Sequence, residues 1–403
     1  MYFNVFIYKM FHASAEAISA MVAASSVAAT VTTLLIGALS DKIGKRKIFI
    51  CGGYIVWGIT IWSFSLIRTD VINALFPSIA SAAAMGVSLT IIMDCVMTFF
   101  GSAANDACFN AWLTDVTDEG NRGSVEGINA MMPLVAILVV FGGFMGLDQN
   151  LQSSWVTIFN IIGIAVILIG ISGFFLISDP EVKTEDNQNY FANIFYGFRP
   201  GVVKHNPMLY FTLIALALFN ISIQIFMPYL ILYYTETLGM TNYVLIFAPA
   251  IILAAVFTAL YGKVYDRKGF KAAILPTLAL LMIGYVMLYI ARSTAPVFLG
   301  TLVMMCGYLG TGAVIGAKIR THTPPNKSGM FQGLRIFGQV LIPGIIGPAI
   351  GAAVLKNADT IVNGDGTVSF IPNENIFLAA LIAIVAIWVI LIPMFRKEKN
   401  HAH

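Results

Sequence analysis

Residues 101–123 combine polar side chains with a composition that otherwise fits a membrane-spanning helix. Polar residues recur there and just upstream at intervals of four, at Asp94, Thr98, Ser102, Asp106 and Asn110. Residues four apart share one face of an α-helix, so we predict a continuous polar stripe at bilayer depth. A carboxylate there costs at least about 2.5–3.5 kcal/mol unless it faces protein or water. The stripe, with Asn105 beside Asp106, favours an ion- or substrate-binding site; the alternative is an acid satisfied by neighbouring helices without a transport role.

The composition predicts an all-α polytopic membrane protein. Charged residues make up 11% of the 403 residues, hydrophobic residues make up 58%, and the mean hydropathy is +0.84. A soluble chain carries about 25% charged residues. The four cysteines and the scattered histidines show no metal-binding spacing. No nucleotide-binding or nucleophile motif is found, so we expect neither an enzyme nor an ATP-driven transporter, and no cofactor.

Eleven complete membrane spans are predicted, preceded by the end of another helix at Met1–Lys9. They lie at 16–39, 48–66, 88–115, 124–146, 154–178, 207–234, 243–261, 270–290, 295–318, 329–354 and 375–395. Of the 23 Lys and Arg residues, 18 fall in alternate loops and the C-terminal tail, and four fall in the opposite loops. By the positive-inside rule the C-terminus is cytoplasmic, and we expect a multi-pass protein of the plasma (inner) membrane.

The two halves of the chain repeat each other. The segment Gly37–Lys47 recurs as Gly262–Lys271 at an offset of 225 residues, whereas Gly123 and Gly329 are 206 residues apart. The difference of 19 residues locates an insertion near 70–88. Parallel repeats of this kind occur in secondary transporters. The first offset aligns Met1 with the interior of a later helix, so we expect an incomplete first helix; the alternative is a genuine eleven-helix protein.

The repeat and the loops predict the domain organisation. We expect an N-terminal helical bundle, a cytoplasmic linker, a C-terminal helical bundle and a cytoplasmic tail at 1–178, 179–206, 207–395 and 396–403. Tyr190–Phe198 in the linker is aromatic and amphipathic, which is typical of a segment that lies on the inner membrane surface. Asn-Gly and Asp-Gly pairs in the loop 355–374 predict a small turn or hairpin.

The motif Gly37–Lys47, with its repeat, resembles the loop 2–3 signature of the major facilitator superfamily, and the resemblance covers essentially the whole chain. It implies two six-helix bundles, the first helix truncated here, that move around a central site. Asp106–Thr117 is similar to helix 4 of the glycoside–pentoside–hexuronide:cation symporters, the melibiose-permease relatives, which implies that Asp106 belongs to a coupling-cation and sugar site. The helix-2 acids of that branch are replaced by Ala29 and Thr33. This departure favours proton coupling or uniport over a sodium site.

The superfamily resemblance also implies a cytoplasmic gate. Its loop acid corresponds to Asp41 and Asp266, which would lie near the helix starts at Gly329 and Gly123 of the opposite halves. The predicted gating residues are Asp41, Arg46, Asp266, Arg122 and Glu126. The alternative is a tight turn that only anchors the loop in the cytoplasm.

Polar residues in two later spans complete the predicted ion- and substrate-binding set. Asn220 and Gln224 lie one turn apart, where their amides can hydrogen-bond a sugar. Arg335 and Gln339 share a helix face; the arginine fork suits hydroxyls or carboxylates, but the side chain can equally snorkel to the interface. In the span at 16–39 we expect a close-packed face of small residues, at Ser19, Ser26, Thr30, Thr33 and Gly37.

Together these features predict a secondary transporter. By resemblance, its solute is a sugar or glycoside and its transport is coupled to H⁺ or Na⁺. The alternatives are a transporter of the same fold for a non-sugar solute or for drug efflux, and a non-transporting sensor. The expected partners are the lipid bilayer and a small solute, without nucleic acid or an obligatory protein partner.

Overall fold

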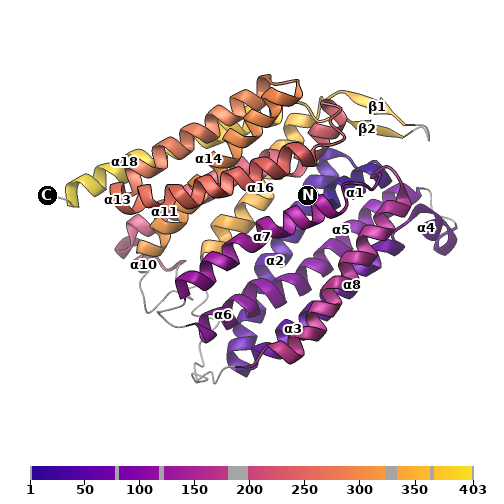
Figure 1. Cartoon of the computed structure of the whole chain (residues 1–403), viewed down its shortest axis with the longest axis horizontal. Helices are drawn as coiled ribbons and strands as arrows, with labels where there is room; N and C mark the ends of the chain where they lie inside the picture. Colours follow the sequence, from indigo (N-terminus) through magenta and orange to yellow (C-terminus); the bar gives the residue numbers. More distant parts are fainter. Residues whose placement is uncertain are drawn as a thin grey trace. The chain divides into compact units, whose positions relative to one another are not determined.

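The computed structural model describes residues 2–77, 81–117, 122–179, 198–322, 334–363 and 367–401. This part of the chain is helical apart from its loops and one two-stranded sheet (Figure 1). It forms two compact units, Tyr2–Ala192 and Asn193–His403, each with its own helical core. The all-α fold predicted from the composition is confirmed.

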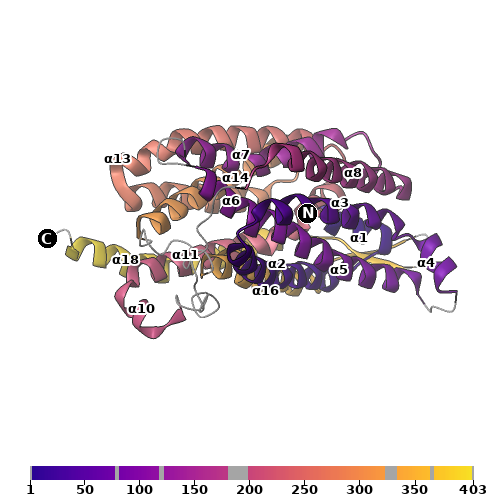
Figure 2. The ribbon, with the colours of Figure 1, turned by 90° about the horizontal axis from the view of Figure 1, so that it is seen from below.

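The N-terminal unit is built around one long interrupted helix. Its elements are α1 (Tyr2–Phe11), α2 (Ala15–Ile43), α3 (Arg46–Ser63), η1 (Phe64–Leu66), α4 (Thr69–Leu75), α5 (Ala82–Gly101), η2 (Ser102–Phe109), α6 (Asn110–Val116), α7 (Arg122–Gly143) and α8 (Gln152–Leu176). The interrupted helix consists of α5, η2 and α6. α1 and α2 pack against α5 (Figure 2), and α3 packs against both η2 and α8.

The C-terminal unit repeats this plan with different local winding. Its elements are α10 (Pro200–His205), α11 (Pro207–Phe226), η4 (Met227–Tyr229), α12 (Leu230–Leu232), η5 (Tyr233–Thr237), α13 (Val244–Ile290), α14 (Thr294–His322), η7 (Phe337–Leu341), α16 (Ile342–Leu355), β1 (Thr360–Val362), β2 (Val368–Phe370), α17 (Asn375–Val385) and α18 (Ile387–His401). The elements η1 and η4 are 3₁₀ turns, and η2, η5 and η7 are π-helices. α13 packs along α14, and α11 packs against α16 and α17.

Ten helices of the described part are long and apolar enough to cross a membrane. They correspond to ten of the eleven predicted spans and confirm them. The other predicted span, 124–146, coincides with α7, several of whose side chains lie outside the described residues. The spans predicted at 243–261 and 270–290 are two separate helices within α13, which meet at a kink where Gly269 has non-helical backbone angles (φ 76°, ψ 179°).

The glycines of the repeated loop motif have a conformational role. Gly44 ends α2 with a φ of 68°, and its backbone N–H donates to the carbonyl of Ser40 at 2.9 Å. Gly269, at the matching position of the second half, has a φ of 76°. Positive φ is strained for residues with a Cβ atom, so both turns favour glycine. The shared backbone geometry supports the repeat inferred from the sequence.

Other glycines allow the closest helix contacts in each unit. A Cβ at Gly58 of α3 would lie 2.7 Å from the carbonyl oxygen of Gly163 in α8. In the C-terminal unit, a Cβ at Gly307 of α14 would lie 2.3 Å from the backbone nitrogen of Leu281 in α13. Helix backbones come this close only where side chains are absent. By contrast, no described atom lies within 4 Å of a Cβ at Gly316.

The small-residue face predicted for the span at 16–39 is present on α2. Ser19, Ser26 and Thr30 are buried. Ser26 and Thr30 donate their hydroxyls to carbonyls one turn back, at 2.7 and 2.9 Å. Ser26 and Thr30 are thus satisfied within their own helix, which fits a packing role, whereas the buried Thr33 hydroxyl has no partner among the described residues.

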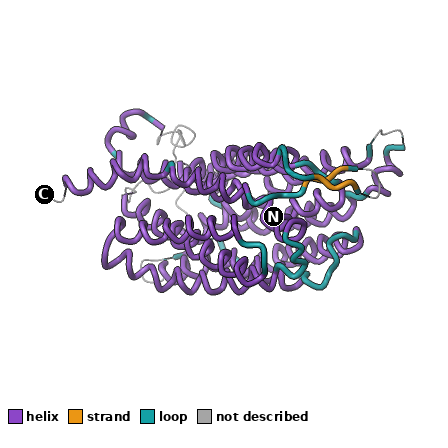
Figure 3. The backbone as a smooth tube through the Cα atoms, turned by 90° about the horizontal axis from the view of Figure 1, so that it is seen from above, coloured by secondary structure: helices purple, strands orange, loops and turns teal. Residues whose placement is uncertain are grey.

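Two loops have local structure of their own. The predicted insertion at 70–88 contains most of the short helix α4. Between α16 and α17, β1 and β2 form an antiparallel hairpin in which Thr360 pairs with Phe370 (Figure 3). The hairpin predicted for 355–374 is confirmed, although its tip, 364–366, lies outside the described residues. The predicted amphipathic segment Tyr190–Phe198 also lies outside them, except for Phe198.

Candidate functional site

The predicted polar stripe does not continue along one face. α5 is α-helical as far as Gly101, but η2 winds as a π-helix, in which hydrogen bonds reach back five residues instead of four. Asp94 and Ser102 are buried, with 6% and 5% of their surface exposed, whereas Asp106 and Asn110 are exposed. The prediction of a single face is therefore wrong beyond Ser102, because π winding changes the register of the residues that follow.

Asp106 lies at the end of a short hydrogen-bond chain. Tyr54 of α3 donates its hydroxyl to Asn105 Oδ1 at 3.0 Å, and Asn105 Nδ2 donates to Asp106 Oδ1 at 3.1 Å. The tyrosine thereby fixes the direction of the Asn105 amide. Among the described residues, Asp106 Oδ2 has no hydrogen-bond partner, so this exposed carboxylate retains an oxygen that can accept a proton, a cation or a hydroxyl group.

Trp57 lies next to these hydrogen bonds, on the face of α3 that carries Tyr54. Its ring meets that of Tyr54 edge-on, with the ring centroids 5.4 Å apart. A Cβ at Gly101 would lie 2.8 Å from the Trp57 ring, so the glycine makes room for the indole at the start of η2. The indole N–H is buried and has no acceptor among the described residues. A buried donor without a partner costs about 1–3 kcal/mol, which marks this place as strained or as a site for a further acceptor.

Asp94 lies in a different environment, on the face of α5 that packs against α2. Its carboxyl group hydrogen-bonds Ser25. The Ser25 hydroxyl is also 3.0 Å from the carbonyl oxygen of Met21, one turn back in α2. The two acids of the predicted stripe are thus separated: Asp94 is inside the unit, and Asp106 is on its exposed surface.

The predicted residues of the C-terminal unit form two groups. Asn220 of α11 donates to the carbonyl of Leu216 in its own helix at 3.0 Å, and both Asn220 and Gln224 are half-buried. Arg335 Nε donates to Gln339 Oε1 at 3.1 Å, as their spacing on one helix face predicts. Gln224 packs on Gly347, eight residues beyond Gln339, which corresponds to about 12 Å along a helix. The Gln224 amide is therefore not gathered around Arg335.

The predicted gate is only partly visible. Arg46 is buried, and its guanidinium donates to the Ser40 hydroxyl at 3.1 Å, so it braces the turn between α2 and α3. The side chains of the other four predicted gating residues lie outside the described part: Asp41, Asp266, Arg122 and Glu126. The gate stays a prediction.

The end of α8 is fastened to its own unit by contacts that the sequence did not indicate. The Asp179 carboxylate accepts a hydrogen bond from the backbone N–H of Lys47 at 2.7 Å, in the first turn of α3. Trp112 of α6 donates its indole N–H to the carbonyl of Ser178 at 2.9 Å. A carboxylate at a helix N-terminus is favourable because free backbone N–H groups and the helix dipole both attract it.

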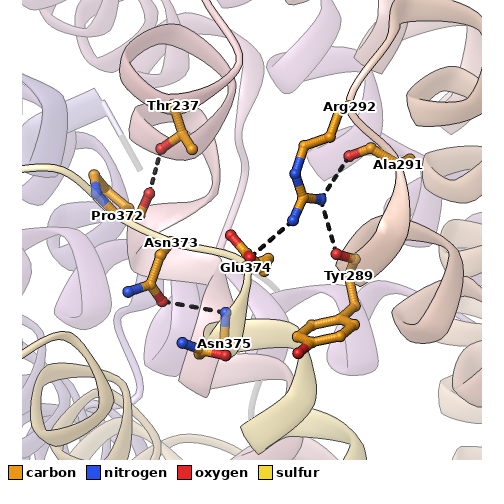
Figure 4. A network of polar contacts seen from close by, with 8 residues as sticks. All are labelled: Thr237, Tyr289, Ala291, Arg292, Pro372, Asn373, Glu374 and Asn375. Atoms are coloured by element: carbon orange, nitrogen blue, oxygen red, sulfur yellow. Dashed lines mark hydrogen bonds and ion pairs between the residues drawn. The ribbon is translucent and has the colours of Figure 1, made fainter. Parts of the chain in front are cut away.

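A second polar network lies beside the hairpin of the C-terminal unit (Figure 4). Arg292, between α13 and α14, forms an ion pair with Glu374 at 2.8 Å and donates to two nearby backbone carbonyls. Thr237, at the end of η5, donates its hydroxyl to the carbonyl of Pro372. The network joins three segments of this unit and contains no predicted site residue.

The groove found in the C-terminal unit does not coincide with the predicted site. A groove of about 140 Å³ lies between α13 and α14, lined by residues that include Thr258, Tyr261, Tyr265 and Gly310. None of the predicted site residues lines it. Among the described residues, no group of three or more His, Cys, Asp or Glu side chains is placed to hold a metal ion.

Two site residues were not predicted, Tyr54 and Ser25. Tyr54 follows Gly52 and Gly53, and a Cβ at Gly53 would lie 2.8 Å from the Cβ of Ala104. A glycine pair in a span is a recognisable signal for close helix approach, and it could have placed Tyr54 beside the Asn105–Asp106 pair. Ser25 gives no such signal, because serines that bond back to their own helix are common in spans.

Comparison with known proteins identifies relatives of this fold. The family model described as the Major Facilitator Superfamily matches residues 1–348. The structure of a mutant of the nucleoside transporter NupG aligns with a TM-score of 0.71 and 13% identity, covering 97% of this chain and 94% of that one. A bacterial homolog of the human lysosomal transporter Spinster aligns with a TM-score of 0.68 and 14% identity, covering 98% of this chain and 94% of that one. The xylose transporter XylE from E. coli aligns with a TM-score of 0.66 and 13% identity, covering 96% of this chain and 95% of that one. No curated protein sequence matches the chain.

Proposed function

We propose, from the premise that this chain belongs to the major facilitator superfamily, that it is a secondary transporter which moves a small polar solute by alternating access. The observation that carries the proposal is Asp106, an exposed carboxylate within a span, oriented by Asn105 and Tyr54. A carboxylate in a span is expensive unless it serves an ion or solute path. We infer that the solute path follows the face of η2 that carries Asp106.

We propose that the solute contains a sugar ring. Asp106 and the neighbouring amides offer hydrogen-bond acceptors and donors for hydroxyl groups, and the rings of Tyr54 and Trp57 offer apolar faces beside them. The similar structures named above include a nucleoside transporter and a xylose transporter, whose solutes share this chemical unit. The resemblance to the melibiose-permease branch favours the same class. A sugar, a glycoside and a nucleoside are the members to test.

We propose a proton as the coupling ion. Asp106 is the acid of this cluster, and the helix-2 positions that carry acids in the melibiose-permease branch hold Ala29 and Thr33 here. A single carboxylate suits a proton, whereas a dehydrated metal cation requires several oxygen ligands. Protonation would remove a charge that is costly in any occluded state, so it would alter which side of the transporter opens.

The test is uptake into proteoliposomes that contain the purified chain. Radiolabelled xylose, a galactoside and uridine would each be offered under an inward proton gradient, an inward sodium gradient and no gradient. We expect uptake of at least one solute that the proton gradient accelerates and that Asp106→Asn abolishes. Asp70→Asn is the matched control, because Asp70 lies in α4, outside the candidate spans, and pairs with Arg68 at 3.1 Å.

Two results would contradict the proposal. Uptake that responds to sodium and not to protons would replace the coupling ion. The absence of flux for any of the three solutes, together with saturable binding of one of them, would favour a non-transporting sensor.

The membrane location follows the same premise. We propose that the protein lies in the plasma (inner) membrane with its C-terminus in the cytoplasm, because the loops on that side hold most of the Lys and Arg residues. A fluorescent protein fused after His403 should be protected from protease in intact cells. Cleavage in intact cells would reverse the orientation.

A further inference from the structure

We propose that Asn110 holds η2 in its π-helical register and thereby places Asp106 on the exposed face of the span. Asn110 is on this view a positioning residue: it acts on Asp106 through the backbone. The role given to the π register rests on the proposed function, because this register supplies the Asp106 carboxylate to the proposed solute site. The register itself is a physical property that can be tested without a solute.

The hydrogen bonds at the end of η2 identify the role of Asn110. In an α-helix its backbone N–H would donate to the carbonyl of residue 106; here it donates to the carbonyls of Asn105, five residues back, and Ala107. The side chain supplies the bond that this shift takes away. Asn110 Nδ2 lies 3.2 Å from the carbonyl oxygen of Asp106 and 3.2 Å from that of Asn105. One asparagine therefore serves both carbonyls at the π-turn.

The burial pattern shows what the π register does to Asp106. Residues 102–104 are buried, and burial resumes at Ala107 and Cys108, so that Ala107 lies five residues after Ser102. A π-helix has more residues per turn than the about 3.6 of an α-helix, so its buried face recurs later along the chain. In α winding, Asp106 would follow Ser102 onto the buried face. In π winding, Ala107 takes that place and Asp106 is exposed.

The second half of the chain provides an internal comparison. At the offset of 206 residues, Gly316 corresponds to Asn110 and Gly312 corresponds to Asp106. The helix that contains these glycines, α14, is α-helical from Thr294 to His322. The asparagine and the eight-residue π-helix thus occur together in one half and are both missing from α14. The other π-helices, η5 and η7, are five residues long, so they have fewer shifted bonds to support.

The experiment measures the register directly. The four native cysteines are replaced, and a single reporter is introduced by Asp106→Cys or by Ala107→Cys. Each purified protein, in detergent, reacts with a small water-soluble thiol reagent. With Asn110 intact, we expect fast labelling at position 106 and slow labelling at position 107, because Ala107 is buried.

Adding Asn110→Ala should slow labelling at position 106 and leave labelling at position 107 slow. We expect the rate at position 106 to fall by roughly five- to tenfold, the population change expected from losing one hydrogen bond. Position 107 should stay buried in α winding, because it follows the buried Ala103 by four residues. Thr117→Val is the matched control, because Thr117 also donates to a carbonyl four residues back, at 2.7 Å, but lies beyond η2. The control should leave both rates unchanged.

The proposal is overturned if folded Asn110→Ala leaves the labelling rate at position 106 unchanged, or if labelling at position 107 accelerates, which would indicate local unfolding and not a change of register. Should Asn110→Ala fail to fold, Asn110→Asp removes the amide donor at nearly the same size, and the same criterion applies. If labelling at position 106 does not slow, but transport still requires Asp106, only this inference is wrong. If labelling at position 106 slows in a protein that moves no solute, only the proposed function is wrong.

Discussion

The span formed by α5, η2 and α6 and the helix α14 occupy matching positions in the two halves, yet their middles differ. The first winds as a π-helix and exposes a carboxylate at Asp106. The second stays α-helical and uses Gly307 to approach the backbone of α13. A common topology therefore carries charge in one half and close packing in the other. The sequence repeat identifies the fold, but a site residue in one half does not predict a site residue at the matching position of the other half.

The largest effect is expected at the charged position itself. Asp106→Asn should reduce gradient-driven uptake to the background of empty vesicles, because the amide can neither carry a charge nor exchange a proton. Gly312→Ala, at the matching position of α14, should leave uptake largely intact, since its new Cβ would meet Phe219 only at an ordinary 3.8 Å. Initial uptake rates in proteoliposomes measure both variants. Equal losses in the two would show that the halves share the chemistry.

The close approach of α14 to α13 at Gly307 predicts a loss of stability when a side chain is added there. Gly307→Ala should destabilise the C-terminal unit by about 1–3 kcal/mol, because its Cβ would overlap the backbone of Leu281. Gly316→Ala meets no described atom within 4 Å and should be neutral or stabilising by up to about 1 kcal/mol. Thermal unfolding in detergent, followed by tryptophan fluorescence, compares them. A normal melting temperature for Gly307→Ala would refute the close approach.

A smaller effect is expected from the residue that orients the site. Tyr54→Phe removes the hydrogen bond to Asn105 and should raise the KM for solute by up to about tenfold, with little change in melting temperature. Tyr261→Phe is the counterpart in the other unit, where the hydroxyl donates to the carbonyl of Ala273 at 3.0 Å. It should leave the KM unchanged. If both variants shift the KM alike, the effect of Tyr54 is general and not local to Asp106.

The smallest effect concerns the partly exposed ion pairs. Glu374→Gln breaks a contact between distant segments and should lower stability by about 0–1 kcal/mol, less so at high salt. Asp70→Asn breaks an ion pair between near neighbours in the sequence, Arg68 and Asp70, but its amide oxygen can still accept the hydrogen bond that Gln152 Nε2 donates at 3.2 Å, so it should have no measurable effect. Melting temperatures at low and high salt test both. If Glu374→Gln lowers the melting temperature strongly, and equally at low and high salt, then the ion pair in Figure 4 is shielded from solvent, contrary to the exposure of its two side chains.

The sequence predicted most of the fold for identifiable reasons. Apolar runs long enough for a bilayer located ten confirmed spans, since their length and composition are local properties. Turn-forming pairs located the hairpin, and the motif glycines located turns with positive φ at Gly44 and Gly269. The site was predicted less well. Asp106, Asn105 and Asn110 do lie together, but Asp94 faces another helix, and Tyr54 was missed.

What the sequence alone determined was which segments cross the membrane, which halves repeat and where an acid lies at bilayer depth. What only the tertiary structure decided was the direction in which that acid points. Residues 102–109 have the same polar spacing whether the chain winds with four-residue or five-residue hydrogen bonds. The choice depends on contacts from α3, where Gly53 meets Ala104 and Trp57 covers Gly101, and on the bonds made by Asn110. Such contacts join residues far apart in the chain, so no local pattern reveals them.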